Sequence, residues 1–132
     1  MDTVSGTSGN DTINAQAVDA TGAAKTTLSD FDSIDGGAGT DTLNIYTAAA
    51  ENTTFPTATT VKNVEIVNIY NTAAAAALGD ASKFQGVTQM WQHGTNAADV
   101  SKLAATTTAG FKAVEATVTA DLDVSAATQL RL

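Results

Sequence analysis

The chain has 132 residues with one proline and no cysteine, and its formal net charge is −8 at pH 7. This length suits one modest domain, and six basic against fourteen acidic residues argue against nucleic acid or an anionic membrane as a partner, because both need clustered cations. Without cysteine the chain has neither disulfides nor Cys-ligated zinc, and no apolar run approaches the roughly 20 residues that span a bilayer.

The first predicted unit, residues 1–46, is turn-rich and acidic and contains one sequence phrase twice, at 2–14 and at 32–44. Each copy holds two Asp-x-apolar triplets nine residues apart, joined by a Gly-rich link. A nine-residue period of glycine turn plus short strand is the signature of a parallel β-roll that holds calcium in its turns. We therefore expect a parallel β-roll in this region, with calcium held in its turns.

The residue types in these turns suit calcium chemically. Seven of the fourteen acidic residues lie within residues 1–41, and all seven are aspartates, whose short arm reaches a cation held by its own turn. Glycine permits left-handed backbone, which lets several carbonyl oxygens point inward, and calcium takes six to eight oxygen ligands. The apolar residues of the triplets, predicted to anchor the strands in the core, are Val4, Ile13, Ile34 and Leu43. The alternative is a metal-free turn in which the aspartates cap backbone amides.

The second predicted unit, residues 47–132, is rich in alanine and threonine and is expected to continue the first as solenoid coils. Residues 42–46 match residues 66–70 closely, and residues 64–67 match 87–90 and, more weakly, 114–117. Periods of this size indicate coils that each contribute a short strand. Residues 121–125 form a further candidate strand.

Two segments of this unit are left open between a short helix and an extended solenoid face, namely residues 72–84 and 99–105. The first contains a run of alanines, the best helix formers. Both chain ends look cut, so we expect a fragment of a longer protein. The overall prediction is a mostly β fold, a right-handed parallel β-roll or β-solenoid with calcium-binding turns.

The segment 36–44 fits the nonapeptide Gly-Gly-x-Gly-x-Asp-x-apolar-x at every defined position, and 6–14 fits with one departure, Thr7. These residues resemble the repeats-in-toxin (RTX) proteins, and their combination with Ala/Thr-rich strands resembles bacterial surface-layer proteins exported by the type I route. The resemblance implies Ca²⁺ as the cofactor. It also implies that carboxylates and backbone carbonyls of the repeats bind the ion, at Asp2, Gly6, Gly9, Asp11, Asp32, Gly36, Gly37, Gly39 and Asp41.

Nothing in the sequence indicates catalysis. His93 is the only histidine, and no serine is marked as its nucleophile partner. Glu65 and Glu115 occupy equivalent positions in the loose repeat, so they are expected to share a solvent face rather than to flank a substrate.

The expected function is structural: a segment of a secreted, calcium-dependent bacterial surface-layer protein, assembled with copies of itself at the cell surface. We expect no nucleic-acid partner and no membrane insertion, and attachment to cell-surface polysaccharide through other parts of the parent protein. Two alternatives remain open. One is a calcium-rigidified module of an RTX adhesin, and the other is the RTX region of a type I-secreted enzyme or toxin.

Overall fold

The computed structural model describes residues 1–16, 21–23, 27–30, 32–47, 55–70, 79–94, 100–112 and 129–131. These residues form short strands and one 3₁₀ helix, η1 (Ala81–Lys83). The strands are β1 (Thr3–Ser5), β2 (Thr12–Ala15), β3 (Ser33–Asp35), β4 (Thr42–Tyr46), β5 (Thr60–Lys62), β6 (Ile66–Tyr70), β7 (Gly79–Asp80), β8 (Phe84–Gln85), β9 (Gln89–His93), β10 (Val100–Ser101), β11 (Thr108–Lys112) and β12 (Gln129–Arg131).

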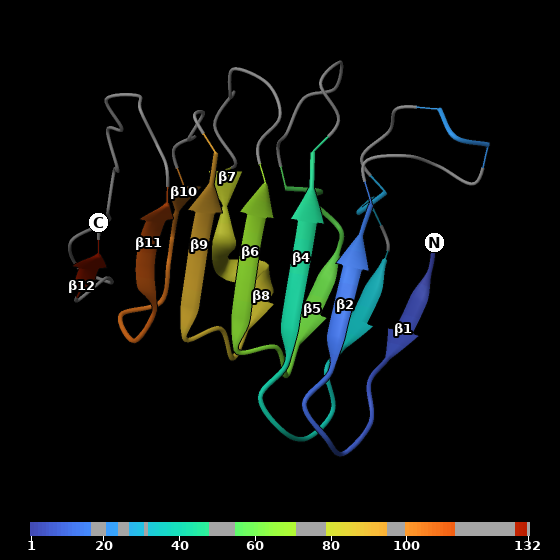
Figure 1. The fold of residues 1–132 in the computed structure, drawn as a ribbon, viewed down its shortest axis with the longest axis horizontal. Coiled ribbons are helices and arrows are strands. Elements are labelled where there is room, and N and C mark those ends of the chain that lie inside the picture. Colours follow the sequence, from blue (N-terminus) through green and yellow to red (C-terminus); the bar gives the residue numbers. More distant parts are fainter. Residues whose placement is uncertain are drawn as a thin grey trace.

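The strands belong to parallel sheets that run along the long axis of the molecule (Figure 1). The largest sheet has six strands in the order β12-β11-β9-β6-β4-β2, and a second has four in the order β1-β3-β5-β8. A third sheet pairs β10 with β7. In the first two coils the chain passes from a strand of the four-stranded sheet to a strand of the six-stranded sheet. Each strand of the second coil pairs in parallel with the equivalent strand of the first. The predicted parallel β-roll or solenoid is therefore confirmed.

The strand register follows the repeats that the sequence predicts. Ile13 lies opposite Leu43, so the two nonapeptide copies stack in register. Leu43 in turn lies opposite Val67, and Val67 opposite Met90, as the two closer matches of the loose repeat predicted.

The weaker match, to residues 114–117, is wrong, because Met90 pairs with Ala109 of β11. Phe84-Gln85 and Phe111-Lys112 both stand just before the matched residues, but they do not occupy equivalent places in the fold. The first pair forms β8 in the four-stranded sheet, whereas the second ends β11 in the six-stranded sheet. A strand with Ala109 and Gly110 at its centre carries little β propensity, so the sequence does not mark it.

The core lies between the two larger sheets and is aliphatic. Leu43, Val67 and Val61 are fully buried, and Phe84 meets Phe55 edge to face with ring centroids 4.7 Å apart. Of the four predicted strand anchors, Ile34 and Leu43 are buried and Ile13 packs partly buried against the core. Val4 is 37% exposed, because it lies at the open face of the first coil.

The outer face of the six-stranded sheet carries polar and aromatic ladders that run from coil to coil. The amide Nδ2 of Asn44 donates to Oδ1 of Asn14 at 2.9 Å, and Nδ2 of Asn68 donates to Oδ1 of Asn44 at the same distance. Beside them the Tyr46 and Tyr70 rings stack at 4.7 Å, and His93 stacks on Tyr70 at 4.5 Å. These ladders lock the coils in register on the face that the core does not stabilise.

The two open helix segments are not α-helical where the structure describes them. Residues 79–84 form β7, η1 and the start of β8, and residues 100–105 form β10 followed by a loop. The candidate strand at 121–125 lies outside the described residues. Within the described ranges, no helix is long and apolar enough to cross a membrane.

Candidate metal site

The turns that join the four-stranded sheet to the six-stranded sheet lie together along one edge of the solenoid, which we call the turn edge. It consists of residues 6–11, 36–41, 63–65 and 86–88. In Figure 1 these turns form the lower edge, and those of the first two coils are visibly the longer loops. The turn edge therefore changes character between the second coil and the third.

The two short turns are closed by the hydrophobic effect. Val64 and Val87 stand at their centres, and both side chains are buried. The two long turns contain only glycine, threonine, serine, asparagine, aspartate and the small side chain of Ala38. Because no large apolar side chain anchors the long turns, they need another source of stabilisation.

One carboxylate per coil connects the first three turns. The backbone N–H of Asp11 donates to Oδ1 of Asp41 at 2.7 Å, and the N–H of Asp41 donates to Oε2 of Glu65 at 2.8 Å. A backbone hydrogen bond joins the same two turns, since the N–H of Thr42 donates to the Asp11 carbonyl oxygen at 2.9 Å. Asp11, Asp41 and Glu65 are thus stacked, and we refer to them as the carboxylate ladder.

The glycines of these turns are required to different degrees. A Cβ on Gly6 would lie 1.9 Å from the Gly36 carbonyl oxygen, and one on Gly36 would lie 1.8 Å from the Asn63 carbonyl oxygen. Gly37 and Gly39 have φ values of 97° and 130°, which favour glycine. Gly9 differs from the other four, because its Cβ would meet nothing closer than Thr7 Oγ1 at 3.8 Å.

The ladder contains one carboxylate oxygen that the protein leaves without a partner. Asp41 is 0% exposed, and its Oδ2 has no hydrogen bond within the described part of the chain. In the first coil the corresponding oxygen, Oδ2 of Asp11, accepts bonds from the N–H and hydroxyl of Thr7 at 2.6 and 3.0 Å. Burying an unpartnered carboxylate oxygen is costly unless a cation compensates it.

These residues fit calcium. The donors at the turn edge are carboxylate and backbone oxygens, the hard ligands that calcium prefers, and the Asn63 carbonyl lies beside the same glycine as Asp41 Oδ2. Among the described residues, no group of three or more His, Cys, Asp or Glu side chains could hold a metal. The Gly-rich turns predict that backbone carbonyl oxygens supply part of the coordination.

Asp2 and Asp32 lie at the opposite end of β1 and β3 from the turn edge. Oδ1 of Asp32 accepts from the N–H of Asp2 at 2.8 Å, and Oδ2 accepts from the N–H and hydroxyl of Ser29 at 2.8 and 3.0 Å. Burial alone would raise the pKa of Asp32, but these hydrogen bonds hold the pKa below its usual value. Asp32 therefore caps a turn, while a calcium-binding role for Asp2 and Asp32 stays a prediction.

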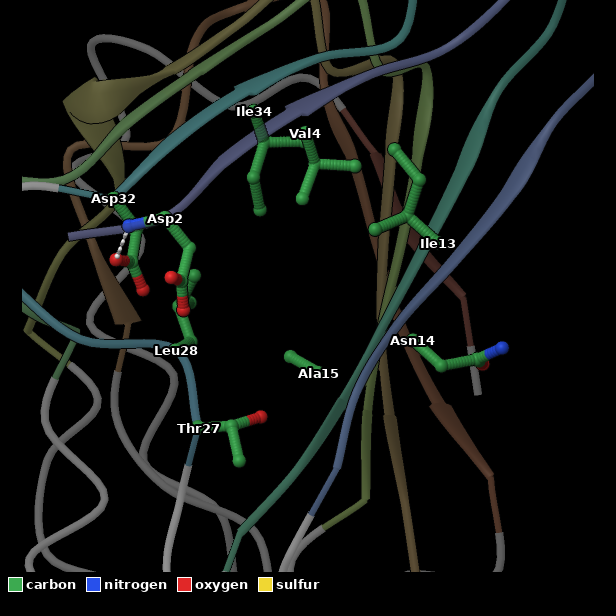
Figure 2. A pocket seen from close by; sticks show the side chains of 9 residues that line it. All are labelled: Asp2, Val4, Ile13, Asn14, Ala15, Thr27, Leu28, Asp32 and Ile34. Carbon is green, nitrogen blue, oxygen red and sulfur yellow. Dashed lines mark hydrogen bonds between the residues drawn. The ribbon is translucent and has the colours of Figure 1, made fainter. Parts of the chain in front are cut away.

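A cavity of about 120 Å³ opens between β1 and β2, next to the Asp2–Asp32 hydrogen bond (Figure 2). The Val4, Ile13 and Ile34 side chains gather at one side of it, and Leu28 and Ala15 line another part. Although Asp2 and Asp32 also line this cavity, most of its lining is aliphatic, so the turn edge is the better candidate for a cation site.

Sequence reasoning missed Glu65, which it placed on a solvent face together with Glu115. Glu65 lies instead on the turn edge, half-buried, as the third member of the carboxylate ladder. The available signal was its position directly before a strand, since Glu65-Ile66-Val67 repeats the pattern of Asp41-Thr42-Leu43. Glu115 lies outside the described residues.

His93, the only histidine, lies away from the turn edge at the far end of β9. Its Nε2 is 3.1 Å from Oδ1 of Asn68, and its ring stacks on Tyr70. Burial and the nearby charge of Lys112 lower its pKa. These contacts give His93 a place in the outer ladders of the sheet.

Compared with protein-family models, residues 1–17 and 27–44 match the RTX calcium-binding nonapeptide repeat (4 copies). No curated protein and no solved structure matches the chain. The matched residues include both long turns and the strands on either side of them, which is where Asp41 is left with an unpartnered oxygen. RTX nonapeptide repeats bind calcium, and proteins that carry them are typically secreted. The first two coils are therefore RTX-type calcium-binding repeats, and calcium is the cofactor of this chain.

Proposed function

We propose that the chain is a structural segment of a secreted bacterial surface-layer protein that depends on calcium to fold and to assemble with copies of itself. The observation that carries the proposal is the buried, unpartnered Oδ2 of Asp41 within stacked Gly-rich turns. A carboxylate left in this state needs a cation, and the turns have no apolar anchor to replace one.

The physical mechanism is thermodynamic linkage. At low calcium, the stacked carboxylates of Asp11, Asp41 and Glu65 repel one another, and the Gly-rich turns retain high conformational entropy when unfolded. Bound calcium supplies positive charge and an oxygen-binding centre. Ion binding adds RT ln(1 + [L]/Kd) to the unfolding free energy, about 2.7 kcal/mol per site at 100 times Kd. That is a large share of a typical domain stability of about 5–15 kcal/mol.

The structural role is supported by how the described side chains are used. The Asn and Tyr ladders and the carboxylate ladder all join one coil to the next. His93 takes part in these ladders, and we propose no catalytic function for the chain. A net charge of −8 also keeps copies of the chain apart until a divalent cation screens or bridges them. We further propose that parts of a longer protein outside this chain attach it to cell-surface polysaccharide.

Circular dichroism and thermal melting with calcium and with a chelator test the folding part of the proposal. We expect the β signal and the melting temperature to fall in chelator, and an unchanged spectrum and melting point would contradict the proposal. Electron microscopy of the parent protein with added calcium tests the assembly part. Ordered sheets support a surface layer, whereas a monomer that binds a target supports an adhesin module.

A further inference from the structure

The third turn, residues 63–65, lies outside the residues that match the nonapeptide repeat, yet it presents oxygen atoms to the second turn. Its sequence, Asn-Val-Glu, has no glycine. It nevertheless contacts Asp41 as the second turn contacts Asp11, through a carboxylate that accepts the backbone N–H of the preceding coil.

Asn63 holds its carbonyl in place through an uncommon backbone conformation. It is one of two non-glycine residues with positive φ in the described part of the chain, at 52°. Its side-chain Nδ2 donates to Oδ1 of Asp35 at 2.7 Å, which fixes that conformation. As a result the Asn63 carbonyl oxygen lies against Gly36, 1.8 Å from where a Cβ would stand.

Asp41 Oδ2 lies on the same side. It would be 2.6 Å from a Cβ on Gly36, so it and the Asn63 carbonyl oxygen converge on the same glycine. The residue that corresponds to Thr7 in this coil is Gly37, which has no hydroxyl, and its N–H donates to Asp35 at 3.2 Å instead. An oxygen without a partner is therefore found in the second turn and not in the first, and it lies on the side where the third turn packs.

Glu65 supplies the negative charge on the third turn. Its Oε2 accepts from the N–H of Asp41, and it stands where Asp41 itself stands relative to Asp11. Val64, which lies between Asn63 and Glu65, is fully buried and anchors the turn in the core. Oxygen atoms that are held in place before an ion binds lower the entropic cost of binding it.

We propose that the third turn completes a calcium site with the second turn, although it is not a nonapeptide repeat. The ligands from this chain are Oδ2 of Asp41, the carbonyl oxygen of Asn63 and the carboxylate of Glu65. The proposal rests on the proposed function only in that the chain must bind calcium. It extends the ion array one coil beyond the RTX repeats, so calcium stabilises the start of the Ala/Thr-rich coils directly.

The test is calcium binding by the whole chain, measured by isothermal titration calorimetry for wild type and Glu65→Gln. Glutamine still accepts a hydrogen bond from Asp41 N–H, so the substitution removes the charge and leaves the ladder bond. We expect one calcium fewer per chain, or affinity at one site at least about tenfold weaker. Asp80→Asn is the control, because it removes the same charge from an exposed pair with Lys102, away from the turn edge.

Glu65→Asp is the second variant, and circular dichroism at saturating calcium checks that each variant is folded. Aspartate restores a carboxylate of the kind present at Asp41, so we expect the wild-type number of ions. Wild-type binding by Glu65→Gln would overturn the proposal, as would loss of the ion in both Glu65 variants, because charge would then not be what holds it. If Glu65→Gln binds calcium like the wild type but Asp41→Asn loses calcium, the further inference fails and the proposed function stands. Absence of calcium binding by the wild type overturns both.

Discussion

Replacing Asp41 by asparagine is predicted to change stability in opposite directions with and without calcium. The substitution keeps Oδ1 as acceptor for the Asp11 N–H at 2.7 Å and replaces the unpartnered Oδ2 by an amide Nδ2. That amide is a donor facing the region of the Asn63 carbonyl oxygen. Without calcium the variant therefore gains what the buried, unpaired oxygen costs, about 1–3 kcal/mol of unfolding free energy.

With calcium at 100 times Kd, the same variant loses the binding contribution of the site, about 2.7 kcal/mol. The assay is urea unfolding followed by circular dichroism, once in chelator and once in calcium. Asp30→Asn is the matched control, because its Oδ1 accepts from the Ala58 N–H at 3.0 Å on the opposite edge. The unfolding free energy of Asp30→Asn should change by the same amount in chelator and in calcium. Equal destabilisation of Asp41→Asn in chelator and in calcium would show that Asp41 only caps a turn.

Three further predictions concern close packing and titration. Gly36→Ala places a Cβ 1.8 Å from a backbone oxygen and should cost at least about 3 kcal/mol, whereas Gly9→Ala has open space and should cost under about 1 kcal/mol in chemical unfolding. Gly110→Ala should lower the melting temperature and alter the fluorescence of Trp91, whose indole lies 2.2 Å from the added Cβ; an unchanged emission maximum would contradict this contact. Because burial lowers the pKa of His93, the unfolded chain takes up the proton first. Melting temperature should therefore fall as pH drops below about 6.5, and less so in His93→Gln; equal slopes for both proteins would refute this.

The sequence specified the first two coils well because their turns constrain the chain locally. Glycines at 37 and 39 adopt positive φ, and the apolar residue after each aspartate enters the core at Ile34 and Leu43. The spacing of these residues sets the length of the turn and the direction of each strand. The match of residues 42–46 with 66–70 extended the register into the third coil, because both strands place their alternate apolar residues in the core.

The later coils were harder to predict because tertiary packing decides them. Strand β11 is accommodated in the sheet by Trp91, whose ring covers Gly110, and single-sequence periodicity does not report a contact between neighbouring coils. An alanine run favours a helix in isolation, but the described residues beyond it pair as strands. Glu65 was missed because a glutamate outside the glycine pattern looks like any solvated charge, and only stacking brings it to Asp41.

The most direct test of the account is the anomalous scattering of crystals grown with saturating calcium. We predict a calcium peak on the turn edge, about 2.3–2.6 Å from an Asp41 carboxylate oxygen. A well-ordered turn edge with no peak, in which Asp11 and Asp41 contact only protein atoms or water, would contradict the claim that calcium joins the coils of this protein.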